Sequence, residues 1–201
     1  WDRRVLLRSG RHGSVKNIDT FGSHQALLEG LPKLMTTMAL AAALVLPSTL
    51  EAQMRGEIGI AVGECPELVE IEDLDGNPLN LMDYVGEKPL LVEFYARWCE
   101  NCEALLPQMR NVYNRFNDRI EFLAISVAVA QSPRSVKRAL ADHPVDWDTA
   151  WDEGGRAVRA FLAPATSYIV VLDQQGIVTY TGIGPEQNIE AAVMTALKES
   201  D

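Results

Sequence analysis

The apolar positions along the chain fall into runs separated by turn residues, and these runs predict the order of strands and helices. Two continuous apolar runs, at residues 90–95 and 120–129, are typical of strands buried in the centre of a sheet. Ser132 before Pro133 predicts a helix that continues to about Ala141, with serine as the N-cap and proline at the first helical position. The other expected elements are hairpins at 68–82 and 168–181, helices at about 99–116, 155–161 and 186–198, and a short extended piece at 145–150. This order indicates an α/β domain with helices on both faces of a mixed sheet.

The N-terminal part of the chain has a different pattern. Residues 1–33 are polar and show no sustained period, so we expect a disordered tail there. The apolar run at 34–46 is shorter than the ~18 to 20 residues that span a bilayer, and its length is typical of the apolar region of a signal peptide. We therefore expect a signal peptide or N-terminal membrane anchor at 34–52, a linker at 53–66 and the folded domain at 67–201. This interpretation predicts an exported protein, periplasmic or on the extracytoplasmic face of a membrane.

The charge and the cysteine count exclude several classes of protein. The formal net charge is -10, and the acidic excess lies after residue 52. A nucleic-acid partner would need a basic face, so none is expected. The three cysteines, at 65, 99 and 102, are too few for a disulfide-stapled scaffold or a four-cysteine zinc site. We expect no metal and no cofactor.

Cys99 and Cys102 are the main candidates for chemistry. They lie three positions apart at the start of a predicted helix, so they share one turn and can form a disulfide with little backbone movement. A helix start stabilises an anion, which makes Cys99 the expected attacking thiolate and Cys102 the residue that resolves the mixed disulfide. Glu100 disfavours the neighbouring thiolate and therefore indicates a reductant rather than a strong oxidant. The alternative is a purely structural disulfide.

The order of these elements resembles the thioredoxin fold, with a strand, Trp-Cys-x-x-Cys, a helix, a strand and helix, and a closing hairpin and helix. The finer pattern resembles the TlpA/ResA family of membrane-tethered or periplasmic thiol-disulfide oxidoreductases. The matching stretches are Asp-Leu-Asp-Gly at 73–76, Gly-Glu-Lys-Pro at 86–89, Phe-Tyr-Ala-Arg-Trp-Cys at 94–99 and Leu-Asp-Gln-Gln-Gly at 172–176, with glycines at 182 and 184. The resemblance covers about residues 57–200.

This resemblance implies a thioredoxin-like fold in which helices flank a mixed central sheet and an extra β-hairpin precedes the first central strand. It also implies a Cys99/Cys102 dithiol–disulfide cycle that reduces disulfides of exported client proteins, such as apocytochromes c or other envelope proteins. A membrane thiol reductant would then supply the electrons.

Glu93 is the next candidate, because it interrupts an apolar strand where a lone carboxylate is costly unless it is paired or protonated. Its position, six residues before Cys99, resembles that of the buried acid of thioredoxin, which implies a general base for Cys102 with a raised pKa. The alternative is that it points to solvent or to a lysine. TlpA/ResA relatives usually carry an acid three residues after the second cysteine, where this chain has Leu105. Any proton shuttle therefore depends on Glu93 or on no side chain.

The resemblance also implies residues that contact the client. Trp98 is expected to pack beside the disulfide and shield it, with ordinary core packing as the alternative. The fold places a cis-proline opposite the disulfide, after a residue whose backbone pairs with substrate. A gapless count puts Ser167 at the proline position and Thr166 before it, whereas Pro164 fits only with three extra residues in the following segment. A cis bond before serine would cost ~3 to 4 kcal/mol, so either the peptide bond before Ser167 is trans or Pro164 takes the position. Of these two we expect Pro164 as the cis-proline.

Two other functions are possible in this fold class. A peroxiredoxin-like peroxidase would need Ser or Thr ahead of a single peroxidatic cysteine, but Trp98 precedes Cys99. A Sco-like copper-binding module would need Cys-x-x-x-Cys and a distant histidine, and after this Cys-x-x-Cys pair only His143 follows. His143 is otherwise expected in a surface loop, and Cys65 is expected to be a linker or buried thiol.

Overall fold

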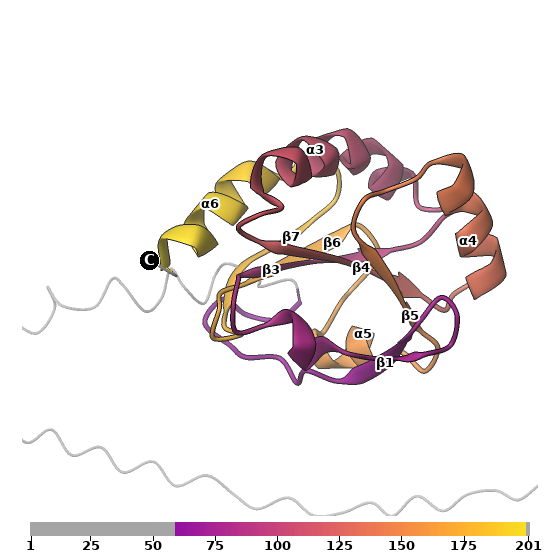
Figure 1. Ribbon diagram of the computed structural model, residues 1–201, viewed down its shortest axis with the longest axis horizontal. Coiled ribbons are helices and arrows are strands. Elements are labelled where there is room, and N and C mark those ends of the chain that lie inside the picture. The colour runs from indigo at the N-terminus through magenta and orange to yellow at the C-terminus, as the bar shows by residue number, and fades with distance from the viewer. Residues whose placement is uncertain (1–58, 200–201) are drawn as a thin grey trace, which may run out of the picture. The chain divides into compact units, whose positions relative to one another are not determined.

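Strand β3 (Leu90–Tyr95), which leads into the cysteine pair, lies inside the sheet between β4 and β6 (Figure 1). The structure, a computed structural model, describes residues 59–199. The other strands are β1 (Glu70–Asp73), β2 (Pro78–Asn80), β4 (Glu121–Val127), β5 (Asp148–Asp152), β6 (Tyr168–Leu172) and β7 (Val178–Ile183). The helices are α3 (Glu100–Phe116), α4 (Pro133–Asp142), α5 (Arg156–Ala160) and α6 (Ile189–Glu199), with a 3-10 turn, η2, at Leu81–Tyr84.

The sheet is mixed, with the strand order β2-β1-β5-β4-β3-β6-β7. Strand β3 pairs in parallel with β4 and antiparallel with β6, and β4 pairs in parallel with β5. The two outer pairs, β1–β2 and β6–β7, are antiparallel hairpins. Because β3, β4 and β5 run in parallel, their carboxyl ends lie at one edge of the sheet, and the residues that follow β3 are delivered to that edge. The expected thioredoxin-like fold is confirmed.

The strands at the centre are buried on both faces, which explains their continuous apolar runs. On one face Leu91 and Ile169 pack with Leu105 of α3 and Val193 of α6. On the other face Val92, Phe94 and Tyr168 pack with Phe161, directly after α5. The ring centroids of Phe94 and Phe161 are 5.6 Å apart. Alternate residues of β3 therefore belong to different cores, and a single strand joins the two layers.

Both hairpins turn with the same four-residue pattern, Asp-x-x-Gly. In the first hairpin the Asp73 carboxylate accepts hydrogen bonds from the backbone N–H groups of Asp75 (2.7 Å) and Asn77 (2.9 Å). In the second, Asp173 accepts from Gln175 and Ile177, both at 2.9 Å. The glycines that close the turns have φ values of +85° and +80°. An aspartate that bonds its own turn and a glycine in the left-handed region are the residues that this geometry favours.

Some element boundaries differ from the expected ones. The last helix begins at Ile189 rather than at 186, because Asn188 accepts from the Ala191 N–H (3.0 Å) as a cap does.

Part of the expected linker packs against the domain: the Ile60 N–H donates to the Tyr168 hydroxyl (3.0 Å), and Ile60 is buried. The expected tail at 1–33 and the signal peptide or anchor at 34–52 lie outside the described residues. Within 59–199, no helix combines the length and apolar character needed to cross a membrane.

Candidate active site

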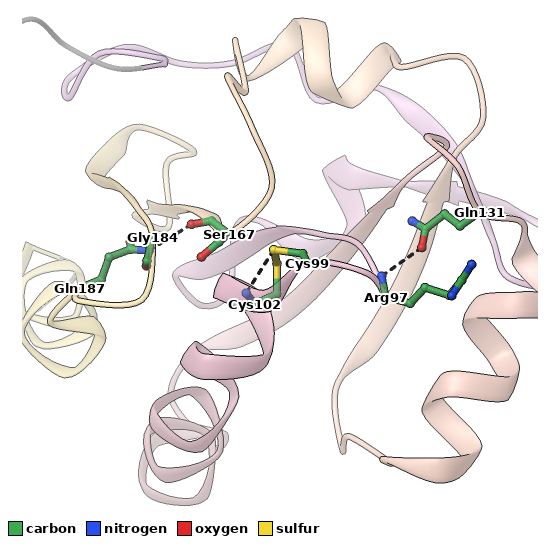
Figure 2. Close-up of a disulfide and its surroundings, with 7 residues drawn as sticks. All are labelled: Arg97, Cys99, Cys102, Gln131, Ser167, Gly184 and Gln187. Carbon is green, nitrogen blue, oxygen red and sulfur yellow. Dashed lines mark hydrogen bonds between the residues drawn. A yellow bond between two sulfur atoms is a disulfide. The ribbon is translucent and has the colours of Figure 1, made fainter.

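The structure joins Cys99 and Cys102 in a disulfide at the first turn of α3, with their Cα atoms 5.3 Å apart (Figure 2). Cys99 is the N-cap residue, and its sulfur accepts a hydrogen bond from the Cys102 backbone N–H at 3.1 Å. Cys99 is 9% exposed and Cys102 4%, so Cys99 is the more accessible residue of the pair. The free N–H groups of a helix start stabilise a thiolate at the N-cap position. This geometry can support nucleophilic attack by Cys99.

Two carboxylates share the first turn with the cysteines. Glu100 and Glu103 are both exposed and both lie in the first turn of α3. Acidic side chains there are favourable for the helix dipole, but they oppose the formation of another negative charge on Cys99. The anion-stabilising effect of the helix start is therefore partly offset at this site.

Gln131 holds the loop that leads into Cys99. Its Oε1 accepts the Arg97 backbone N–H at 3.0 Å, and its Nε2 donates to the Val127 carbonyl (2.6 Å) and the Ser126 hydroxyl (3.0 Å) at the end of β4. The Arg97 side chain donates to Ser135 in α4 at 3.2 Å. These bonds fix the loop to two neighbouring elements, so the cysteines lie on a rigid support.

Trp98 does not pack into the core, because its side chain is 45% exposed. Its indole N–H donates to the Val129 carbonyl at 2.8 Å, and Val129 is itself an exposed apolar residue. The alternative of ordinary core packing is therefore wrong. A tethered, half-exposed indole directly before Cys99 offers a contact surface for another molecule.

Glu93 is buried in β3 and lines a cavity of about 300 Å³ together with both cysteines of the disulfide. Its neighbours across the sheet are Ala124 on β4 and Ile169 on β6, neither of which carries a charge. Burial raises the pKa of Glu93 to about 7, because the carboxylate form loses hydration there. A carboxyl group with that pKa can both hold and release a proton near neutral pH.

The wall opposite the Arg97 loop is formed by Ser167, directly before β6 (Figure 2). Its N–H donates to the Phe94 carbonyl at 2.8 Å, and its carbonyl accepts from the Gly184 N–H and the Gln187 Nε2, both at 3.1 Å. The backbone of Ser167 is left-handed, with φ of +60°, and the side chain is completely buried. Among the described residues, its hydroxyl is the one buried side-chain oxygen or nitrogen without a hydrogen-bond partner. A buried, unpaired hydroxyl costs about 1 to 3 kcal/mol.

The expected cis bond at Pro164 is wrong, because no peptide bond within residues 59–199 is cis. Pro164 lies in an exposed segment, three residues before Ser167. Ser167 takes the place at the start of β6 that the gapless count gave it, and Thr166 precedes it. A left-handed serine with a trans peptide bond therefore occupies the position where the fold normally has a cis-proline. The cost of a cis non-proline bond explains why the chain avoids one.

Three residues of the site were not identified from the sequence as part of it. Gln131 and Gln187 lie in loops and act over 34 and 20 residues of chain, so no local pattern marks them. His143, which follows α4, lines the same cavity as Glu93 and the cysteines. It lies between α4 and β5, and no local pattern in the sequence marks it as part of the cavity.

A redox-active pair of cysteines at a helix start, directly after the central strand of this sheet, defines a thioredoxin-like thiol-disulfide oxidoreductase. A profile of the AhpC/TSA family matches residues 62–181, and the chain belongs to that family.

Comparison with individual proteins agrees with this class. ResA, a thiol-disulfide oxidoreductase of Bacillus thuringiensis subsp. konkukian, is 25% identical over 130 residues, which cover 63% of this chain and 73% of that protein. The thioredoxin-like protein YneN of Bacillus subtilis is 28% identical over 130 residues, covering 64% and 75%. The thioredoxin domain of a thiol-disulfide oxidoreductase from Bacteroides vulgatus superimposes with a TM-score of 0.57 at 20% identity, covering 67% of this chain and 99% of that domain. The resemblance seen in the sequence is confirmed.

Proposed function

We propose that this thiol-disulfide oxidoreductase works as a reductant of disulfides in exported client proteins. The observation that carries the proposal is the disulfide between Cys99 and Cys102, capped onto the start of α3. In the reduced protein, the Cys99 thiolate attacks a client disulfide, one client sulfur leaves as a thiolate, and a mixed disulfide forms. Cys102 then attacks the Cys99 sulfur of the mixed disulfide, which releases the second client sulfur and regenerates the Cys99–Cys102 bond.

The reductive direction is supported by the charges at the helix start. A strong oxidant needs a very stable thiolate in its reduced form. The first turn of α3 carries Glu100 and Glu103, which destabilise a thiolate on Cys99. A membrane thiol reductant would return two electrons and two protons to the pair after each turnover.

Glu93 is proposed as the general base for Cys102. It lines the same cavity as that cysteine, and its raised pKa of about 7 lets it accept the thiol proton as Cys102 attacks the mixed disulfide. Leu105 stands where relatives of the TlpA/ResA type usually carry an acid, and it is buried. This leaves Glu93 as the proposed proton acceptor.

Trp98, Pro164 and Thr166 are proposed to contact the client. The half-exposed indole of Trp98 directly precedes Cys99, and the segment around Pro164 is exposed. The backbone of Thr166 precedes Ser167 as the substrate-pairing residue precedes the cis-proline in the resembled fold. The clients would be exported proteins such as apocytochromes c. The apolar run at 34–46 supports a location at the extracytoplasmic face of a membrane, with residues 34–52 as signal peptide or anchor.

The peroxidase and copper-binding alternatives are not favoured. A peroxidatic cysteine needs a Ser or Thr ahead of it, whereas Trp98 occupies that position and Cys99 is paired with Cys102. The names of the similar proteins are those of thiol-disulfide oxidoreductases and thioredoxin-like proteins.

The test is the reduction potential of the Cys99/Cys102 couple, measured against glutathione, together with turnover of insulin disulfides. A potential near that of thioredoxin, roughly −270 mV, is expected, and one near DsbA, roughly −120 mV, would contradict the reductant assignment. Cys102→Ser should lose turnover and accumulate a mixed disulfide with the client, whereas Cys99→Ser should lose turnover and trap nothing. Cys65→Ser is the matched control and should keep wild-type turnover, because Cys65 is an exposed thiol outside the pair.

A further inference from the structure

The Ser167 hydroxyl is a buried hydrogen-bond donor that the oxidised protein does not use. The side chain is fully buried and its oxygen has no partner within the described part of the chain. The residue cannot turn away easily, because its backbone is held at both ends. Its N–H is bonded to Phe94, and its carbonyl is bonded to Gly184 and Gln187. These bonds keep the residue in the left-handed conformation that a serine rarely adopts.

The same bonds place Ser167 at the end of β3 that leads into the cysteines. Phe94, the partner of the Ser167 N–H, belongs to one buried cluster with Cys99 and Cys102. Figure 2, a close-up of the disulfide, shows Ser167 on the side opposite to Arg97 and Gln131. The hydroxyl is therefore a donor without an acceptor, in the immediate surroundings of the group that changes charge during turnover.

The oxidation state of the cysteines decides whether the hydroxyl has an acceptor. A disulfide sulfur carries no charge and accepts hydrogen bonds weakly. When the pair is reduced, the S–S bond breaks and one sulfur becomes a thiolate, which carries a full negative charge. Hydrogen bonds to a charged group are about twice as strong as those between neutral groups.

We propose that Ser167 is a positioning residue whose hydroxyl donates a hydrogen bond to the Cys99 thiolate in the reduced protein and lowers the pKa of that thiol. The proposal rests on the proposed redox cycle and adds a residue that tunes it. The hydroxyl counteracts the carboxylates near the pair, and so keeps enough thiolate for attack near neutral pH. The other charged or titratable groups around the pair among the described residues are Glu93 and Tyr95 on β3, Arg97 in the following loop, Glu100 and Glu103 on α3, and His143 after α4.

The experiment measures the pKa of the Cys99 thiol in the reduced protein, from thiolate absorbance and from the alkylation rate across pH. Ser167→Ala removes the hydroxyl and keeps the β-carbon, whereas Ser167→Gly removes the hydroxyl and suits the positive φ. Both should raise the thiol pKa by about one unit, which lowers the alkylation rate below that pKa about tenfold, as the loss of one charge-assisted hydrogen bond predicts. Thr179→Val is the matched control: its hydroxyl bonds the Val171 carbonyl within the β6–β7 pair, and its loss should leave the thiol pKa unchanged.

The possible outcomes separate this inference from the proposed function. If wild-type protein reduces insulin but neither Ser167 variant shifts the thiol pKa, the hydroxyl is only a buried polar group and the proposal is overturned. It is also overturned if Ser167→Ala shifts the pKa and Ser167→Gly does not, because the backbone would then be the cause. If the wild-type pair shows no measurable potential and no insulin turnover, the redox function itself fails. Ser167→Gly keeps the test decisive should Ser167→Ala fail to fold.

Discussion

Two walls flank the disulfide: the Gln131 wall, with Arg97 and Gln131, and the Gln187 wall, with Ser167, Gly184 and Gln187 (Figure 2). The two walls differ in whether every buried side-chain polar group has a hydrogen-bond partner. The Gln131 side chain accepts a hydrogen bond from the Arg97 N–H and donates to the Ser126 hydroxyl and the Val127 carbonyl of β4. The Gln187 side chain bonds the carbonyls of Ser167 and Gly184 and accepts from the Tyr180 hydroxyl at 3.2 Å. Both amides thus use both ends to tie a loop to a neighbouring element.

The difference lies in what each glutamine holds. On the Gln131 wall, the tied residue Arg97 has no positive φ and no buried side-chain polar atom of the described residues there is unpaired, although Ala130 beside Gln131 has a φ of +52°. On the Gln187 wall, the tied residue is a serine with positive φ and an unpaired hydroxyl. Chains keep such costly features where the surrounding structure enforces them, and they cluster at sites of chemistry. This difference is the one that the proposed role of Ser167 requires: the Gln131 wall supports the cysteines, and the Ser167 hydroxyl is free to act on Cys99 in the reduced protein.

The two walls also differ in charge, since the cavity with Glu93 extends along the Arg97 side. Glu93→Gln should therefore have the largest effect on how stability depends on pH. The folded protein keeps the Glu93 proton up to a pH of about 7, whereas the unfolded chain loses it near 4.5, so the wild-type free energy of unfolding falls as the pH rises between these values. The variant lacks this fall and should gain about 3 kcal/mol relative to wild type between pH 4.5 and pH 8, measured by urea unfolding.

The same variant tests the catalytic proposal for Glu93. Insulin reduction by wild-type protein should change with pH around 7, and Glu93→Gln should flatten that change. An unaltered pH profile of activity would rule out the general-base role while leaving the stability prediction intact. Thr179→Val, on strand β7, serves as a control that removes a part-buried polar group without removing an acid.

Removing each glutamine in turn tests whether the walls are unequal. Gln187→Ala leaves the Gly184 carbonyl and the Tyr180 hydroxyl without this partner at a buried position, so it should cost about 2 kcal/mol of stability. Gln131→Ala affects a half-buried site that water can reach, and it should cost about 1 kcal/mol. Denaturant unfolding at one pH gives both numbers. Equal costs, or a larger cost for Gln131→Ala, would remove the distinction drawn between the walls.

The smallest effect is expected for the stability of Ser167→Gly. Glycine adopts a φ of +60° without strain and leaves no buried hydroxyl unpaired, which offsets the greater entropy of glycine in the unfolded chain. The variant should be as stable as wild type or more stable by up to about 1 kcal/mol in the same unfolding experiment. A clear loss of stability would mean that the serine side chain contributes to packing that the burial of its hydroxyl does not reveal.

The sequence predicted those parts of the fold that depend on local patterns. Strand β3 lies at the expected residues 90–95, since six apolar or buried positions in a row have no other stable place in such a sheet. The helix from Ser132 and Pro133 has the expected cap, with Ser132 and Ser135 bonding each other's backbone. The cysteine pair was also evident, because its spacing on one helical turn is a local property.

The two walls could not be predicted in the same way, because they depend on contacts between distant residues. Gln131 and Gln187 look like ordinary loop glutamines until the fold brings Arg97 and Ser167 beside them. The sequence predicts Pro164 as the cis-proline because it is the nearest proline, although the gapless count gives Ser167. Whether a serine can stand there depends on the bonds from Gln187 and Gly184, which no local pattern reveals.

The short edge strand β2 and the segment at 63–64 affect how readily another chain can pair with the edges of the sheet. An open sheet edge is a template on which a foreign strand can add and start aggregation. Here the edge strand β2 has three residues and begins with Pro78, which lacks a backbone N–H, and at the other edge Gly63 and Glu64 pair with Val178 at the start of β7. In a protein whose class acts on disulfide-bearing clients, the proline at one edge and the paired segment at the start of the other disfavour strand addition at these two places.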